Sequence, residues 1–197
     1  MTLVDSRPAL QVGPLLTIPN YITIIRTLAA VTLGIVALVS GSVALIAAAY
    51  GIYWLGDMLD GLAARWLGQE TRAGAVLDIV SDRACTAVLC VALVALIPDV
   101  SLVALVFLPS FMVLDTMLSL VFLCWPLLSP NHFQVVDRRV WALNWSPPAK
   151  AVNTAGVIGA VALGQYSVAV AVALAVLAVK VWSAVAVARL LRRDGRA

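Results

Sequence analysis

The chain has 197 residues, of which 63% are hydrophobic and only 12% are charged. A soluble domain is nearer half apolar and a quarter charged, so too little polar surface remains here to cover a water-soluble globule. The net charge of +3 is modest, and the three cysteines show no metal-ligand spacing, which argues against a disulfide framework or a zinc site. We therefore expect an integral membrane protein. No linker or repeat divides it, which predicts one domain over residues 1–197.

Six stretches are apolar over the roughly 20 residues that a helix needs to cross a bilayer core about 30 Å thick. Ahead of them, the segment 10–19 mixes apolar residues with two prolines and predicts an interfacial lead-in. The first stretch shows no cleavage signal and is interpreted as a retained span. The predicted fold class is all-α, with these six transmembrane helices: 21–39, 43–66, 73–97, 101–126, 150–167 and 169–190.

The basic residues predict the orientation. The connectors around 40–42, 98–100 and 164–165 carry no Lys or Arg, and the positive-inside rule makes the other side cytoplasmic. Both termini are then cytoplasmic, and we expect a multi-pass protein of a bacterial plasma membrane. The longest connector, 127–148, carries Trp141 and Trp145, which we assign to an interfacial aromatic belt. The basic residues on the predicted cytoplasmic side are Arg7, Arg65, Arg72, Arg138, Arg139, Lys150, Arg192, Arg193 and Arg196.

Four aspartates stand out between positions 57 and 82, inside otherwise apolar sequence. Each carboxylate in hydrocarbon costs about 2.5–3.5 kcal/mol on insertion scales, so four of them need compensating charge. The four aspartates are poor candidates for helix caps or solvated surface charges, because they lie deep in the predicted helices. They are part of the spacing D-x2-D-G-x2-A-R-x8-G-x3-D-x3-D, filled by Asp57, Asp60, Gly61, Ala64, Arg65, Gly74, Asp78 and Asp82.

Helical geometry brings these carboxylates together. Asp57 and Asp60 are three residues apart and share a helix face, as do Asp78 and Asp82, which are four apart. A short turn joins the two helices, so they run antiparallel. Both outer aspartates then lie about 13 Å from the inner helix ends, at 1.5 Å per residue. We expect convergence at one depth, open to the cytoplasm.

Converging oxygen ligands suit Mg²⁺ or Mn²⁺, and two ions would balance four carboxylates and clamp a phosphoryl group. Gly61 and Ala64 leave a slot beside the ions, and the forked guanidinium of Arg65 suits phosphate. Gly74, four residues before Asp78, permits close approach of a helix or a ligand. The residues thus indicate a metal-held site for a nucleoside diphosphate ester.

This eight-residue pattern resembles the signature of the CDP-alcohol phosphotransferase (CDP-alcohol phosphatidyltransferase) family. The stretch TIPNYITIIRTLA at 17–29 resembles the family's first helix, nearest to phosphatidylglycerophosphate synthases. The resemblance implies transfer of a phosphatidyl group from CDP-diacylglycerol to an acceptor alcohol, with release of CMP. It also implies a homodimer; no feature indicates a nucleic-acid partner.

The resemblance assigns roles to individual residues. The four aspartates match metal ligands, and Asp82 also matches the general base that deprotonates the acceptor. The positions that match contacts to the CDP-lipid are Asn20, Tyr21, Ile22, Thr23, Gly61, Ala64, Arg65 and Thr71.

The acceptor is less well defined by the sequence. The opening PNYITIIR favours glycerol 3-phosphate, with Arg26, Asp115 and Lys150 as candidate acceptor-binding residues. However, Asp115 stands where relatives that use phosphorylated acceptors tend to place Arg or Lys. Cardiolipin synthase-like or inositol-phosphate-type acceptor use is therefore the alternative. Pairing with an arginine such as Arg26 or Arg83 is the role we expect for Asp115, because an intramembrane charge seeks a partner.

Two other classes of protein fit this pattern less well. A cation transporter could also cluster aspartates, but it would have little use for Gly61, Ala64 and Arg65 at fixed offsets. A catalytically dead scaffold would have no reason to keep four costly charges.

Overall fold

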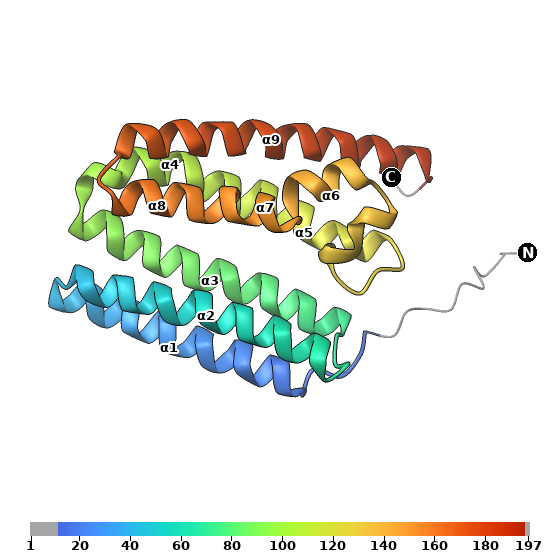
Figure 1. Ribbon diagram of the computed structural model, residues 1–197, viewed down its shortest axis with the longest axis horizontal. Helices are drawn as coiled ribbons and strands as arrows, with labels where there is room; N and C mark the ends of the chain where they lie inside the picture. The colour runs from blue at the N-terminus through green and yellow to red at the C-terminus, as the bar shows by residue number, and fades with distance from the viewer. Residues whose placement is uncertain (1–11, 196–197) are drawn as a thin grey trace, which may run out of the picture.

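The computed structural model describes residues 12–195, and every regular element in that range is a helix (Figure 1). The predictions that fall on Arg7, Arg196 and the start of the lead-in lie outside the described residues. The principal α-helices are α1 (Ile18–Ser40), α2 (Val43–Trp66), α3 (Arg72–Leu96), α4 (Ser101–Pro109), α5 (Thr116–Leu120), α6 (Arg138–Asn144), α7 (Pro147–Lys150), α8 (Val157–Ala162) and α9 (Tyr166–Arg193). Shorter 3-10 and π segments complete the chain: η1 (Pro98–Val100), η2 (Ser110–Asp115), η3 (Val121–Cys124), η4 (Pro130–Val135) and η5 (Ala151–Gly156).

Side-chain caps start the first three helices. The hydroxyls of Thr17, Ser42 and Thr71 accept hydrogen bonds from the backbone N–H three residues on, which satisfies a donor that the first turn leaves free. At the end of α1, Gly41 has φ +69° and donates its N–H back to the helix, so α2 follows after a tight turn. The predicted span 43–66 coincides with α2.

Five helices in the described part of the chain are long and apolar enough to cross a membrane: α1, α2, α3, the run Pro98–Cys124 and α9. The protein is thus a multi-pass membrane protein, and large apolar side chains such as Leu28 and Val39 stay exposed on the outside of α1. The predicted fifth span, 150–167, does not meet this measure. Its helical run extends only from Pro147 to Ala162, because Gly164 at φ +68° ends it.

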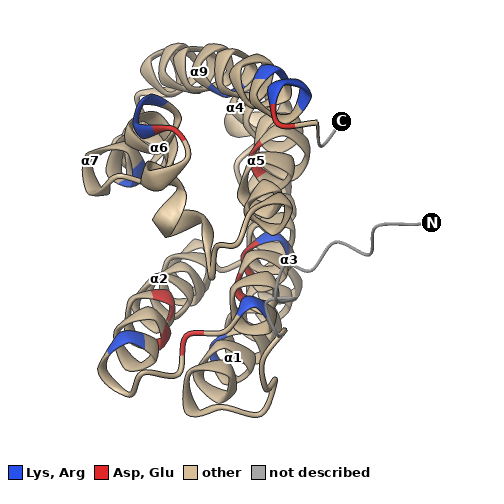
Figure 2. Cartoon of the chain, turned by 90° about the vertical axis from the view of Figure 1, so that its right-hand side faces the viewer, with Lys and Arg blue, Asp and Glu red and all other residues tan. Residues whose placement is uncertain are grey.

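The helices form two groups. Helices α1, α2 and α3 pack together, whereas α9 packs against α4, α6 and α8. Helix α3 also contacts α4 and α5 and thereby joins the groups, as the end-on view shows (Figure 2). Lysines and arginines on α2, α6 and α9 gather at one end of the molecule, near the described ends of the chain (Figures 1 and 2). That this end faces the cytoplasm stays a prediction.

The connector 127–148 is more folded than the sequence suggested. Phe133 of η4 is fully buried, and its ring centroid lies 5.1 Å from that of Trp145. Trp145 itself is only 7% exposed and belongs to the core, so its assignment to an interfacial belt was wrong. Trp141 is half-buried and donates its indole N–H to the Asn131 carbonyl.

Candidate active site

A cavity of about 610 Å³ lies between the two helix groups. Side chains of α2, α3 and the start of α1 line one part of it. Side chains of η2, α6, η5 and α9 line the other part. Both π segments therefore contribute to the cavity wall, and such segments are frequent at functional sites.

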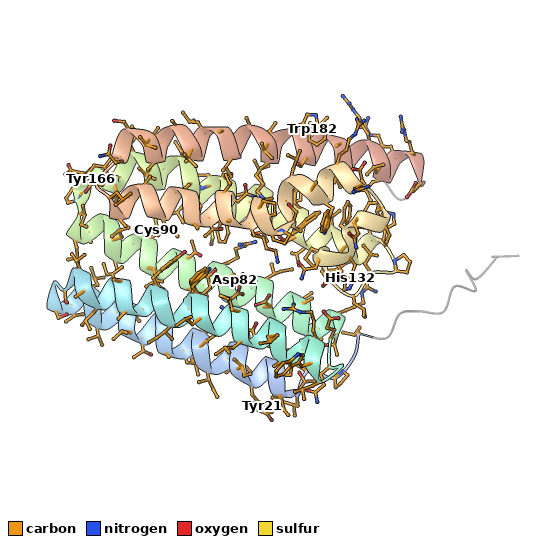
Figure 3. All side chains as sticks on the ribbon, in the orientation of Figure 1. Tyr21, Asp82, Cys90, His132, Tyr166 and Trp182 are labelled. Carbon is orange, nitrogen blue, oxygen red and sulfur yellow. The ribbon has the colours of Figure 1, made fainter. Side chains whose placement is uncertain are left out.

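The four motif aspartates all line this cavity, as the sequence predicted. Asp57 and Asp60 come from α2, and Asp78 and Asp82 come from α3. Figure 3 shows Asp82 in the interior of the bundle, about midway along it. The helical spacings of three and four residues therefore do place each pair on the inward face.

The side chain of Arg26 lies among these carboxylates, and we call the five residues together the acidic cluster. The guanidinium is buried, with 2% of the side chain exposed. Its nitrogen atoms lie 2.8 Å from a carboxylate oxygen of Asp60, 2.5 Å from Asp78, 3.3 Å from Asp57 and 3.2 Å from Asp82. One guanidinium thus pairs with four carboxylates, which leaves a formal charge of −3 when all are ionised.

Two residues let Arg26 reach the carboxylates. A Cβ at Gly56 of α2 would lie 2.5 Å from the Arg26 Cβ, so only glycine leaves room for the arginine stem. The Thr23 hydroxyl, one turn before Arg26, donates to Asp60 Oδ2 at 2.7 Å. Glycine at 56 is the residue directly before the motif, and its packing role could not be read from the spacing.

The acidic cluster fits a divalent metal. One carboxylate oxygen each from Asp57, Asp60 and Asp78 lie within 4.8 Å of one another. Hard oxygen donors of this kind match Mg²⁺ and Mn²⁺, and the excess negative charge favours an added cation. Asp82 lies outside this triad but shares the Arg26 guanidinium with it.

Most of the predicted CDP-lipid contacts also line the cavity: Asn20, Thr23, Gly61, Ala64, Arg65 and Thr71. Tyr21 and Ile22 do not line it. The Tyr21 side chain lies on the outer face of α1, 51% exposed and pointing away from Asp82 (Figure 3). The resemblance assigned all of residues 20–23 to the CDP-lipid site. Only one face of this helical turn lines the cavity, and Tyr21 and Ile22 lie off that face.

The close approach predicted at Gly74 is present. A Cβ there would lie 2.7 Å from Asn20 Oδ1 and 3.0 Å from Thr71 Oγ1. Asn20 in turn donates its side-chain N–H to the Leu15 carbonyl at 2.7 Å. Gly74 therefore lets the start of α1 dock against the start of α3 at the rim of the cavity.

Of the three predicted acceptor contacts, Asp115 and Lys150 line the cavity. Arg26 does not, because its guanidinium is enclosed by the acidic cluster. Lys150 is exposed and donates to Asn131 Oδ1 at 2.8 Å.

Asp115 pairs with Arg83, as predicted, at 2.6 Å. It also pairs with Lys180 of α9, at 2.5 Å, and we call these three residues the Asp115 cluster. Lys180 was not singled out from the sequence. The available signal was a lone lysine within an apolar stretch long enough to cross the membrane, which marks a functional residue by default.

Comparisons with known proteins identify the family of this chain. A sequence model of the CDP-alcohol phosphatidyltransferase family matches residues 16–189, so the chain belongs to that family. Among curated proteins, the chain is similar to a CDP-diacylglycerol–inositol 3-phosphatidyltransferase of Candida albicans (strain SC5314), 42% identical over 84 residues. That match covers 43% of this chain and 36% of the relative. No solved structure matches the chain.

Proposed function

We propose that this protein transfers a phosphatidyl group from CDP-diacylglycerol to the hydroxyl of an acceptor alcohol and releases CMP. The observation that carries the proposal is the convergence of all four motif aspartates on one cavity wall. Membership of the CDP-alcohol phosphatidyltransferase family supports it. Mg²⁺ or Mn²⁺, as two ions on the aspartates, would neutralise the pyrophosphate of the donor.

The protein's own residues have separate tasks in this proposal. Arg65, Thr71 and Asn20 bind the nucleotide half of the donor at the rim, where all three line the cavity. Asp82 accepts the proton of the acceptor hydroxyl as its oxygen attacks the β-phosphorus of the donor. The bond from that phosphorus to the bridging oxygen breaks, and CMP leaves with the electron pair. Positioning and electrostatic stabilisation supply the rest of the rate enhancement.

Two acceptors compete in this proposal. Glycerol 3-phosphate stays a prediction from the first-helix resemblance, and the comparisons lend it no support. Inositol is the acceptor named for the fungal relative. The two differ in charge, so the charges on the cavity wall discriminate between them.

The arrangement in the membrane completes the proposal. In this proposal the site faces the cytoplasm. The basic residues at the adjoining end of the bundle support this orientation, because positive charge favours the cytoplasmic side (Figure 2). The functional unit is a homodimer, as the resemblance to the family implies.

CMP release tests this function. Purified protein with CDP-diacylglycerol, Mg²⁺ and a panel of alcohols is expected to release CMP, and chelation of the metal should stop it. Asp82→Asn should reduce the rate about 10²–10⁴-fold, the usual contribution of a general base. Unchanged metal-dependent release from this variant would show that Asp82 is not the base. A cation transporter would instead be stabilised by Mg²⁺ alone, with no further effect of CMP.

A further inference from the structure

The Asp115 cluster is a second buried polar site in the same cavity, joined to the acidic cluster through α3, which carries both Asp82 and Arg83. Arg83 is 9% exposed and Lys180 only 3%. Their nitrogen atoms lie 2.6 Å and 2.5 Å from different oxygens of the Asp115 carboxylate. Two cations and one anion leave a formal charge of +1, the opposite sign to the acidic cluster.

Other protein groups hold both cations in place. Arg83 Nε donates to Thr116 Oγ1 at 2.8 Å, and its guanidinium lies 3.7 Å from the centroid of the Phe111 ring. Lys180 Nζ donates to Asn144 Oδ1 at 2.9 Å. Neither cation is therefore free to move toward a ligand without losing a partner.

The position of Asp115 follows from its helix. The π segment Ser110–Asp115 begins directly after Pro109, whose ring nitrogen cannot donate to the preceding turn. Thr116 Oγ1 donates to the Phe111 carbonyl, five residues back. The wide turn thereby brings Asp115 to the cavity, where it meets α3 and α9.

The Asp115 cluster lies where an acceptor must bind. Arg83 directly follows the proposed base Asp82 in α3, and both line the same cavity. Asp115, Lys180 and Asn144 line it too. An alcohol whose hydroxyl reaches Asp82 therefore has the rest of its structure against this wall.

The hydrogen-bonding capacity of this wall suits hydroxyl groups. A carboxylate offers about four lone-pair sites, and Arg83, Lys180 and the Ser119 hydroxyl use three of them, so Asp115 can accept one further hydrogen bond. Lys180 has three N–H donors, of which Asp115 and Asn144 take two. A hydroxyl both donates and accepts, and so can use both kinds of group.

The single excess positive charge of this wall does not balance a phosphate monoester. It carries about −1.5 to −2 charge at neutral pH and offers mainly acceptor oxygens. Asp115 would repel it and has already neutralised one of the two cations. Among the predicted acceptor contacts that line the cavity, the one further cation is Lys150, which is exposed at the rim.

From this wall we infer that the acceptor is an uncharged polyhydroxy alcohol rather than a phosphorylated one, and that Asp115 sets this preference. The inference rests on the proposed transferase function and names its acceptor class. Inositol, the acceptor named for the fungal relative, belongs to this class, whereas glycerol 3-phosphate does not.

An acceptor panel with the wild-type protein tests the inference. With CDP-diacylglycerol and Mg²⁺ held constant, kcat/KM is measured for myo-inositol, inositol 1-phosphate and glycerol 3-phosphate. We expect the neutral alcohol to be preferred at least tenfold over both phosphates. Equal or better use of a phosphorylated acceptor would overturn the inference and leave the transferase function intact. CMP release with none of the acceptors would overturn both.

Asp115→Asn tests the residue. Removing the carboxylate leaves Arg83 and Lys180 unneutralised, so the ratio of kcat/KM for inositol 1-phosphate to that for myo-inositol should rise at least tenfold. Asp99→Asn, at an exposed position in η1, is the matched control and should leave the ratio unchanged. An unchanged ratio in Asp115→Asn would overturn the assignment.

A competition experiment does not depend on folding of that variant. Glycerol 3-phosphate, added to the wild-type reaction with myo-inositol, should not act as a competitive inhibitor against the alcohol at equal concentration. Competitive inhibition of that kind would show that the wall accepts a phosphate and would contradict the inference.

Discussion

The cavity brings together two buried charge clusters of opposite design. In the acidic cluster four carboxylates share one guanidinium, whereas in the Asp115 cluster two cations share one carboxylate. The first is short of positive charge and suits a metal-bound pyrophosphate. The second is close to balance and suits hydroxyls. The difference shows that burial of ion pairs alone does not define a binding site; the excess charge and the unused hydrogen-bonding capacity do.

The largest effect is expected from Arg26→Met, which removes the protein's own cation from the acidic cluster. Removal of one partner from a buried ion pair typically costs about 3–5 kcal/mol, because uncompensated charge remains. The free energy of unfolding in detergent should fall by about that amount in the presence of a chelator.

Mg²⁺ should restore much of this stability, by about 2.7 kcal/mol when free Mg²⁺ is 100 times its Kd. Lys180→Met is the matched control, since the Asp115 cluster has no carboxylate excess, and its stability should respond to Mg²⁺ as the wild type does. An Arg26→Met variant with no greater response to Mg²⁺ than the wild type would contradict a cation deficit in the acidic cluster.

Asp78→Asn tests the metal assignment on the same side of the cavity. Asp78 belongs to the carboxylate triad, and loss of one strong electrostatic contact to a transferring group commonly costs about 10²–10³ in rate. CMP release at saturating Mg²⁺ should fall by this factor. Asp99→Asn is the control and should keep wild-type activity. Wild-type activity in Asp78→Asn would show that the triad does not bind the metal.

Gly56→Ala alters the spacing of α1 and α2 at the acidic cluster without altering a charge. The added Cβ would lie 2.5 Å from the Arg26 Cβ, and such overpacking typically costs about 1–3 kcal/mol. Gly51→Ala, five residues earlier in the same helix, has no atom within 4 Å and should be neutral or mildly stabilising. Thermal unfolding of the two variants measures this difference; equal stability would show that α1 and α2 can separate here freely.

The smallest effect is expected from Lys150→Gln, at the exposed rim. Its hydrogen bond to Asn131 is exposed, and exposed substitutions usually change stability by less than about 0.5 kcal/mol. With a neutral acceptor, kcat/KM should change by no more than about threefold. A drop above tenfold would place Lys150 in direct contact with the acceptor and weaken the contrast between rim and wall.

The part of the site that the sequence predicts consists mainly of residues at helical spacing. The spacing of Asp57, Asp60, Asp78 and Asp82 predicted their convergence because it depends only on helix geometry and a short turn. The pairing of Asp115 with an arginine, Arg26 or Arg83, was predicted because an intramembrane charge needs a partner; the structure selects Arg83. These inferences needed no knowledge of how distant helices pack.

Most of the features that were missed depend on the packing of distant helices. Arg26 is 31 residues before Asp57 and Lys180 is 65 residues after Asp115, and nothing in the spacing places either one. The predicted fifth span, 150–167, is not confirmed for a local reason, since the glycine turn at 164 ends its helical run. Trp145 was misplaced because burial against Phe133 requires the fold of the whole connector.

Lys180 also bears on how the protein is assembled during biosynthesis. It lies near the middle of α9, about 20 Å from either helix end at 1.5 Å per residue, where an unpaired lysine costs about 2.5–3.5 kcal/mol to insert. Asp115 precedes it in the chain and emerges from the ribosome first. A counterion for Lys180 is therefore already present when α9 enters the bilayer, so we expect insertion of α9 to depend on the earlier helices as well as on its own hydrophobicity.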